Sequence, residues 1–133
     1  MAKEELIKFS MHANDSGSLC VYESGDLVPF DIKRIFTVTA KKNEVRGNHA
    51  HKMCTQILVC VSGMVEVCCD NGTDKSIYLL SNMGQGLLVP AGVWASEKYI
   101  CGGSVLMALC DRSYESKDYI RDYSEYKQFL QLG

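Results

Sequence analysis

The chain has 133 residues, a length typical of one domain, and we expect residues 1–133 to form a single one. Its 14 Lys and Arg residues are balanced by 16 Asp and Glu residues, which argues against a broad basic surface for nucleic acid or anionic lipid. No apolar run approaches the roughly 18 residues of a membrane span, and acidic residues follow the N-terminal Met where a signal peptide needs an apolar core. The sequence therefore predicts a soluble, cytoplasmic protein that binds neither nucleic acid nor a membrane.

The seven cysteines agree with a reducing compartment. Their number is odd, no two form a C-x-x-C pair, and most of them lie inside apolar runs. A disulfide framework favours an even count in a secreted chain, so we interpret these residues as small buried hydrophobic side chains. Cys54 is the one candidate for a catalytic or zinc-binding thiol, because it lies near two histidines.

Apolar and β-branched runs separated by turn residues predict a series of short strands. In chain order we expect them at residues 19–23, 34–39, 57–61, 64–69, 76–80, 86–89 and 104–110. Residues 57–61 are apolar throughout, which is typical of a strand buried on both faces. Asp70-Asn71-Gly72 is a strong hairpin signal, since Asn and Gly tolerate positive φ. Short strands at this spacing favour a β-sandwich or barrel.

A helix is expected at the C-terminus and nowhere else. Ser124 is a suitable N-cap, and Tyr126, Phe129 and Leu130 share one helical stripe. We expect this short amphipathic helix to pack on the barrel or on a second subunit.

The most informative segment is Arg46-Gly47-Asn48-His49-Ala50-His51-Lys52. Two histidines at i and i+2 lie on one face of a strand, whereas on a helix they would point to different sides. Because strands are expected to follow, we place both imidazoles on a strand and direct them into one cavity. The alternative is a chance polar pair on a solvent-exposed face.

The spacing around this segment resembles the cupin superfamily. His49 and His51 are followed at cupin spacing by Gln56 and Gly63, and Gly84 precedes Pro90-Ala91-Gly92 as in the second cupin motif. The resemblance implies an all-β fold, a single cupin-type barrel (a double-stranded β-helix or jelly roll), carrying the short C-terminal helix.

Two departures bear on metal binding. A metal cupin has Glu at the position of Gln56 and a further His at the position of Ala95, so two of the four ligands are missing here. Two neutral imidazoles and an amide oxygen make a poor site for a divalent ion. Cys54 is three positions from His51 and would face away from it on a regular strand. We therefore expect no metal and no cofactor.

The segment Arg46–Lys52 also resembles the R-G-x-H-A-H-K signature of the dTDP-4-keto-6-deoxyglucose 3,4-ketoisomerases. Further matches at residues 34–36, 89–94 and 114–123 extend the resemblance over residues 5 to 131. It implies a metal-free homodimeric enzyme of bacterial deoxysugar pathways, with O-antigen lipopolysaccharide among the final glycans. Many members have His at the position of Ala95 and Tyr where this chain has Phe36 and Thr37, which puts the stereochemistry of the product in question.

The resemblance and the chemistry of a dTDP-linked keto sugar suggest roles for individual residues. We expect His49 to act as the base at carbon and His51 to act on the sugar oxygens, since neutral imidazole exchanges protons near neutral pH. The substrate-binding candidates are Arg46, Arg34 and Lys52 for the diphosphate, together with Asn48, Gln56, Trp94 and Arg121. For each cation alone, a surface salt bridge is an equally good interpretation.

Three other functions stay open on the sequence. One is a non-catalytic cupin that senses a sugar nucleotide, and another is a metal-dependent dioxygenase or isomerase using both histidines and Cys54. The third is a 3,5-epimerase of similar keto sugars, which is disfavoured because such enzymes pair the basic His with a carboxylate and no acidic residue adjoins this H-x-H.

Overall fold

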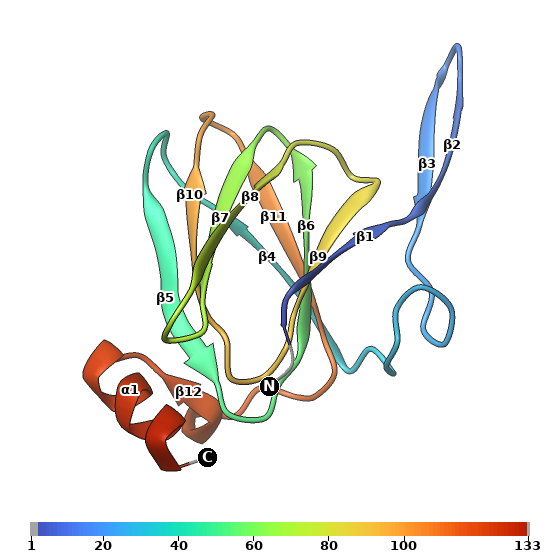
Figure 1. Ribbon diagram of the computed structural model, residues 1–133. Coiled ribbons are helices and arrows are strands. Elements are labelled where there is room, and N and C mark those ends of the chain that lie inside the picture. Colours follow the sequence, from blue (N-terminus) through green and yellow to red (C-terminus); the bar gives the residue numbers. More distant parts are fainter. Residues whose placement is uncertain (1–2, 133) are drawn as a thin grey trace.

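The computed structural model describes residues 3–132, which form two antiparallel sheets facing each other, a separate hairpin and one helix (Figure 1). The strands are β1 Glu5–Lys8, β2 Ser10–Asn14, β3 Gly17–Val21, β4 Arg34–Thr39, β5 Val45–His51, β6 Gln56–Ser62, β7 Val65–Asp70, β8 Lys75–Leu80, β9 Gln85–Val89, β10 Trp94–Tyr99, β11 Val105–Cys110 and β12 Tyr119–Ile120. A 3₁₀ turn, η1, covers Ser116–Asp118, and the helix α1 covers Tyr123–Leu132.

The two sheets carry the core between them. One has the strand order β1-β9-β6-β11-β4 and the other β12-β5-β10-β7-β8. Along β7, Val65, Val67 and Cys69 are buried, while the residues between them are half-buried, as the period of two along a strand dictates. This is the β-barrel fold expected from the sequence.

Strand β6 is buried on both faces, as its apolar run predicts. Leu58 and Cys60 belong to the core between the sheets, whereas Ile57 and Val59 pack in a second cluster with Phe9 and Val28 from the N-terminal segment. The N-terminal segment therefore covers the outer face of the first sheet, and the side chains inside the barrel come from the alternate positions.

Most expected strands lie within one or two residues of the observed ones, and β4 coincides with its expected range. The hairpin at residues 70–72 is confirmed: β7 pairs with β8, and the Asn71 Oδ1 accepts hydrogen bonds from the backbone N–H groups of Thr73 and Asp74. Strands β1, β2, β10 and β12 were not expected. β10 was missed because its sequence, Trp-Ala-Ser-Glu-Lys-Tyr, has no β-branched residue and carries two charges.

The helix α1 is confirmed, but the expected N-cap is wrong. Asp122 caps it, because its Oδ1 accepts hydrogen bonds from the backbone N–H groups of Ser124 (2.7 Å) and Glu125 (3.2 Å). The buried Tyr126 anchors α1, with its hydroxyl within hydrogen-bond distance of the carbonyl oxygens of Asp70 and Gly92. The helix thus lies below one end of the second sheet (Figure 1).

The hairpin β2–β3 projects away from the barrel (Figure 1). It forms a two-stranded sheet of its own, and nearly all of its residues are exposed, including Met11 and Leu19.

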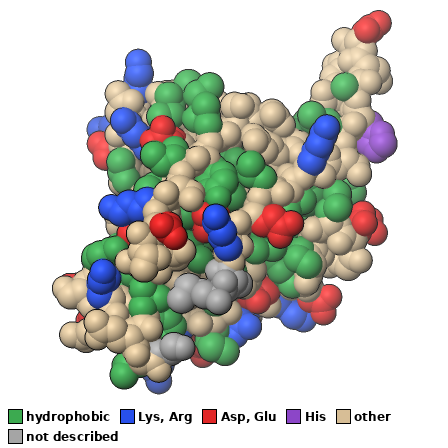
Figure 2. Space-filling model, viewed as in Figure 1, with side chains coloured by type: hydrophobic (Ala, Val, Ile, Leu, Met, Phe, Trp, Pro, Cys, Tyr) green, Lys and Arg blue, Asp and Glu red, His purple; other side chains and the backbone are tan. Residues whose placement is uncertain are grey.

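The cysteines are all free thiols, and Cys54, Cys60, Cys69 and Cys110 are buried. Positive and negative side chains are interspersed on the face shown in Figure 2. Within residues 3–132 no helix combines the length and the apolar character that a membrane crossing requires.

Candidate active site

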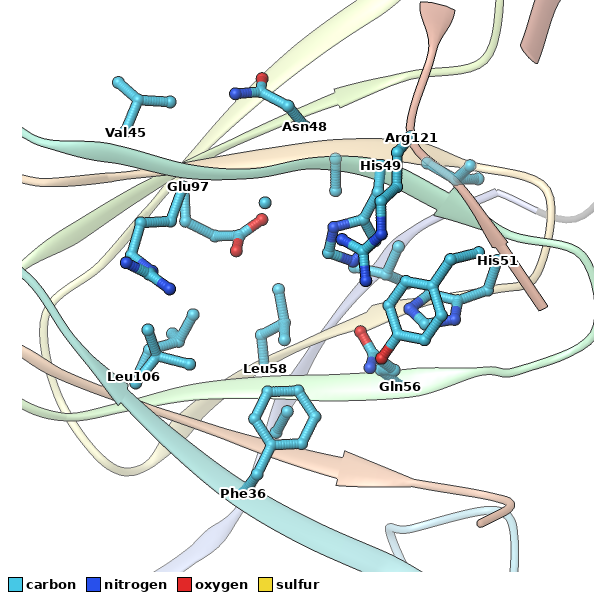
Figure 3. Close-up of a pocket in the computed structure, with 18 of the residues that line it drawn as sticks. Phe36, Val45, Asn48, His49, His51, Gln56, Leu58, Glu97, Leu106 and Arg121 are labelled. Atoms are coloured by element: carbon cyan, nitrogen blue, oxygen red, sulfur yellow. The ribbon is translucent and has the colours of Figure 1, made fainter. Parts of the chain in front are cut away.

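A cavity of about 450 Å³ opens between the wall formed by β4 and β11 and the wall formed by β5 and β10 (Figure 3). Its apolar lining includes Phe36, Leu58 and Leu106. Its polar lining comprises the side chains of His49, His51, Asn48, Gln56, Tyr119, Glu97, Arg34, Arg46 and Arg121. The cavity therefore combines imidazoles, cations and one carboxyl group above an apolar floor.

His49 and His51 point into this cavity from β5, as their i, i+2 spacing predicts. Their ring centroids are 5.0 Å apart and the ring planes are nearly perpendicular, at 86°. Tyr119 from β12 packs against both, with centroids 4.4 Å from His51 and 5.2 Å from His49. The two imidazoles and the Tyr119 ring thus form one surface of the cavity.

His51 is held by a carboxylate that the sequence analysis did not identify. The His51 Nδ1 donates a hydrogen bond to the Asp118 Oδ2 over 2.9 Å, and both side chains are buried. Asp118 also accepts hydrogen bonds from the backbone N–H groups of Met53 (2.6 Å) and Cys54 (3.3 Å). An ionised carboxylate can only accept, so the ring proton of His51 is on Nδ1 and the Nε2 presents a lone pair. That Nε2 is buried and has no hydrogen-bond partner among the described residues.

Both histidines are neutral near pH 7. Burial, together with the charge of a protonated His51, lowers the pKa of His49 to about 4. Burial also lowers the pKa of His51, although Asp118 opposes this effect. Burial raises the pKa of Asp118, but the hydrogen bonds from His51 and the backbone outweigh it and hold that pKa below its usual range. Two neutral imidazoles beside an ionised carboxylate are equipped to accept protons.

Three arginines line the cavity: Arg34 and Arg46, which the sequence analysis assigned to the diphosphate together with Lys52, and Arg121, which it named as a further binding candidate. The Arg34 guanidinium lies 4.6 Å from the ring centroid of Phe36 and 3.5 Å from the Tyr119 hydroxyl. The Arg121 guanidinium lies 4.4 Å from the centroid of the Tyr119 ring. Arg46 comes from β5 and is exposed. None of the three forms an ion pair within residues 3–132, so their charges are free to meet an anion.

The other expected binding residues divide into two groups. Gln56 is buried in the cavity, where its Nε2 donates to the Cys110 Sγ over 3.5 Å, and Asn48 lies exposed at the rim. Lys52 and Trp94 are not part of the cavity lining. The Lys52 side chain is exposed, and Trp94 packs edge-on against Tyr123.

The expectation that Cys54 faces away from His51 is wrong. Strand β5 ends at His51, and the chain then turns so that the Cys54 Sγ, a His51 ring nitrogen and an Asp118 oxygen lie within 4.8 Å of one another. Metal binding would need a thiolate, whereas the hydrogen bond that Cys54 donates to Cys110, together with burial, raises the pKa of the Cys54 thiol. Because Asp118 already accepts three hydrogen bonds, the cluster fits an oriented His–Asp pair better than a metal site.

Glu97 is a second functional candidate that sequence reasoning missed. Its carboxyl group points into the cavity from β10 (Figure 3) and forms no hydrogen bond or ion pair in the described chain. Burial raises its pKa to about 7, although the charge of Arg46 opposes this effect. If β10 had been expected as a strand, the alternation of side chains along it would have placed Glu97 on the same inner face as Ala95.

Asp118 did carry one sequence signal, since it lies inside residues 114–123, which contribute to the family resemblance. Its contact with His51 spans 67 positions of the chain, however, and no local pattern connects the two. The sequence analysis disfavoured an epimerase because no acidic residue adjoins the histidines in the sequence. In the folded structure Asp118 does adjoin His51, so this objection no longer applies.

Comparisons with known proteins agree with this geometry. Residues 2–131 match the family model described as "FdtA: WxcM-like, C-terminal". The TDP-4-oxo-6-deoxy-alpha-D-glucose-3,4-oxoisomerase of Aneurinibacillus thermoaerophilus is 33% identical over 129 residues, which span 96% of this chain and 93% of that protein.

Solved structures of similar proteins extend the comparison. QdtA, a sugar 3,4-ketoisomerase from Thermoanaerobacterium thermosaccharolyticum solved with TDP, superposes with a TM-score of 0.93 at 33% identity, over 97% of this chain and 95% of that one. A 3,4-ketoisomerase from Helicobacter canadensis gives a TM-score of 0.93 at 28% identity, over 98% and 99% of the two chains. An epimerase of Mycobacterium tuberculosis shares the fold at 16% identity, with a TM-score of 0.77 over 87% of this chain and 66% of that one. The resemblance inferred from the sequence is confirmed, and the chain belongs to the FdtA (WxcM-like, C-terminal) family.

Proposed function

We propose that this protein is a sugar-nucleotide 3,4-ketoisomerase that converts TDP-4-keto-6-deoxyglucose to a TDP-3-keto-6-deoxyhexose. The observation that carries the proposal is the pair of neutral imidazoles on one wall of a cavity that three arginines also line. The relatives support it, since a QdtA variant with one histidine replaced by asparagine was solved with TDP-4-keto-6-deoxyglucose.

The reaction needs proton transfers and no external oxidant. The ketone at C4 acidifies the hydrogen on C3, and removal of that proton gives an enediolate. Protonation at C4 and at O4, with loss of the proton on O3, then leaves the ketone at C3 and a hydroxyl group at C4. One carbon is oxidised while its neighbour is reduced, so a set of positioned acids and bases is sufficient.

We assign the carbon chemistry to His49 and the oxygen chemistry to His51. His49 takes the proton from C3 and returns it to C4. The His51 Nε2, whose lone pair is fixed by the hydrogen bond from Nδ1 to Asp118, accepts the proton of the O3 hydroxyl. The carboxylate of Asp118 stabilises the imidazolium that this transfer creates.

Binding of the diphosphate falls to the arginines. Arg34, Arg46 and Arg121 present planar guanidinium groups that suit phosphate oxygens. Gln56 and Asn48 are placed to hydrogen-bond sugar hydroxyls from the floor and the rim of the cavity. For Lys52 and Trp94 the structure favours roles outside the cavity, at the surface and in packing.

The test is the purified protein with TDP-4-keto-6-deoxyglucose in heavy water, with the product identified by NMR. We expect a 3-keto sugar that carries solvent deuterium at C4 in those turnovers in which protonated His49 exchanges with water before it reprotonates the carbon. His49→Asn should abolish its formation, whereas His12→Asn, which changes an exposed histidine on the β2–β3 hairpin, should leave the rate unchanged. A protein that binds TDP without turnover would instead be a sugar-nucleotide sensor.

The same experiment separates a second candidate function. The His51–Asp118 pair is the kind of His–carboxylate arrangement expected of a 3,5-epimerase. An epimerase would leave the ketone at C4 and place deuterium at C3 and C5. Deuterium at C5 with no transposed ketone would therefore refute the ketoisomerase proposal.

We further propose that the protein is a single-domain homodimer that works in the cytoplasm on a deoxysugar pathway. An isolated two-stranded hairpin is at best marginally stable in water, yet β2–β3 projects from the barrel (Figure 1), and its Met11, Leu19 and Val21 side chains are exposed. A second subunit would cover these side chains. Seven free thiols fit a reducing compartment. Sedimentation of the intact protein should give the mass of a dimer, and a monomer would contradict this assignment.

A further inference from the structure

Glu97 faces the two histidines from another side of the cavity. It follows Ala95 by two positions on β10, so both side chains point inward. Ala95 pairs with His49 in the strand register and contributes only a methyl group. Figure 3 shows the Glu97 carboxyl group directed across the open space towards the imidazoles. The middle of the cavity, between the carboxyl group and the histidines, is left for a ligand.

A bulge in β5 creates the space for this carboxyl group. The pairing of β10 with β5 shifts between Ala95 and Ser96, and Gly47 and Asn48 both have positive φ, at 87° and 53°. A Cβ on Gly47 would lie 2.6 Å and 2.9 Å from the two carboxyl oxygens of Glu97. Only a glycine allows this backbone and this side chain to approach so closely.

The groups around Glu97 leave it without a fixed partner. β5 contributes Arg46, which forms no ion pair with it, and His49 beyond it. β7 contributes the Cys69 thiol, and Tyr99 follows on β10 itself. The opposite wall places the apolar Val38 and Leu106 in the cavity, while Arg34 and Arg121 are the remaining charged groups of the lining.

Such a carboxyl group can donate a proton at neutral pH. Burial raises its pKa to about 7, whereas burial lowers the pKa of His49 to about 4. Titratable groups whose environments move their pKa values in opposite directions are suited to opposite roles, the acid and the base.

We propose that Glu97 is the general acid that protonates the carbonyl oxygen of the keto sugar, from the side of the sugar opposite to the two imidazoles. The proposal rests on the function proposed above and adds a third group to its chemistry. It also gives the unpaired carboxyl group a hydrogen-bond partner in the bound substrate.

The proton transfers balance with this assignment. Glu97 gives its proton to O4 while His49 removes the proton from C3, which forms the neutral enediol. His51 then accepts the proton of O3 as the C3 carbonyl forms, and protonated His49 returns its proton to C4. Glu97 ends as a carboxylate and His51 as an imidazolium, and water in the open cavity carries one proton from His51 back to Glu97. C3 is oxidised and C4 is reduced by the same electron pair.

The test compares Glu97→Gln with Glu66→Gln, which removes a carboxyl group from the β7 side of the same sheet, outside the cavity lining. Loss of a positioned general acid lowers turnover by roughly 10²–10⁴-fold. In the parent we expect kcat/KM to fall as pH rises through about 7, where Glu97 loses its proton. Glu97→Gln should lose both turnover and the decrease of kcat/KM at alkaline pH, while keeping the TDP affinity of the parent. Glu66→Gln should match the parent in turnover and pH dependence. Glu97→Asp should turn over more slowly than the parent but keep the decrease of kcat/KM at alkaline pH.

Three results would overturn the assignment. One is Glu97→Gln turning over at the parent rate. Another is an alkaline fall that persists in Glu97→Gln. The third is a loss of TDP affinity in proportion to the loss of turnover, which would show that Glu97 only shapes the site. A parent protein that does not isomerise the sugar would instead refute the proposed function, so the two failures are distinguishable.

Discussion

Replacing Asp118 with asparagine should reverse the proton arrangement of His51. The carboxylate receives three hydrogen bonds, from the His51 Nδ1 at 2.9 Å and from the backbone N–H groups of Met53 and Cys54. An amide has one acceptor oxygen and one donor NH₂ group. The short bond from Met53 (2.6 Å) goes to Oδ1, whereas His51 and the longer bond from Cys54 (3.3 Å) share Oδ2. The amide oxygen would therefore stay with Met53, and the NH₂ group would face His51. The ring proton of His51 would then move to Nε2 and remove the lone pair that faces the cavity.

The expected effect on catalysis is large and the effect on folding is moderate. A positioned acid or base contributes roughly 10²–10⁴-fold, so kcat of Asp118→Asn should fall within that range. A hydrogen bond to a charged group contributes roughly 1.5–3 kcal/mol, which sets the expected loss in the free energy of unfolding at neutral pH. TDP affinity should be unchanged, because Asp118 is not among the residues that line the cavity.

The pH dependence gives an independent check of the same pair. The pKa of Asp118 is lowered from an ordinary value of 3.8, so the stability that its ionised form contributes is fully present above that pH. This stability is lost as pH falls through the lower pKa of the folded state. The unfolding free energies of the parent and of Asp118→Asn should therefore differ at pH 7 and converge in strong acid.

The assay is product formation by NMR for the parent, Asp118→Asn and the control Asp74→Asn, which changes an exposed carboxylate in the β7–β8 turn. Thermal unfolding confirms that each variant is folded. A folded Asp118→Asn protein that isomerises the sugar at the parent rate would refute the argument that this carboxylate sets the proton position of His51.

Two further predictions concern His49 and the cationic residues. Burial lowers the pKa of His49 from 6.5 to about 4, so as pH falls through that window the unfolded chain takes up a proton before the folded chain does, and the free energy of unfolding should decrease. Urea unfolding at several pH values should show a weaker pH dependence for His49→Asn than for the parent. An unchanged pH dependence would contradict the burial argument. Arg46→Ala should weaken TDP binding by roughly 10–100-fold, the equivalent of one charge-assisted hydrogen bond. Lys52→Ala should leave the TDP affinity unchanged, and calorimetric titrations would measure both variants. The reverse ranking of the two affinities would remove Arg46 from the diphosphate site.

The sequence predicts the parts of the site that a local pattern encodes. The i, i+2 spacing of His49 and His51 places both rings on one face because side chains alternate along any strand. The apolar run of β6 and the Asp70-Asn71-Gly72 turn likewise predict burial and pairing from neighbouring residues alone. These features hold in the structure because each depends on a few consecutive positions.

The remaining parts depend on contacts between distant positions. Asp118 reaches His51 because β12 pairs with the end of β5, an arrangement that a two-residue strand gives no local sign of. Cys54 turns towards the same pair because β5 stops at His51, whereas the expectation assumed a continuous strand. Glu97 was missed with the whole of β10, whose sequence has low strand propensity and is held in place by pairing with β5 and β7.

The contact with Asp118 also makes two otherwise similar imidazoles chemically different. His51 has a carboxylate at its Nδ1, so a proton arriving at Nε2 produces an imidazolium with an adjacent negative charge. The His49 Nδ1 is buried and has no hydrogen-bond partner among the described residues, and burial lowers its pKa to about 4. Protonated His49 is therefore the stronger acid of the two. A base that must return its proton to C4 within the same turnover benefits from that property, since a stronger acid releases a proton to carbon more readily. The group that takes the proton of the hydroxyl benefits instead from holding a proton more firmly, and the adjacent carboxylate of Asp118 gives His51 this property.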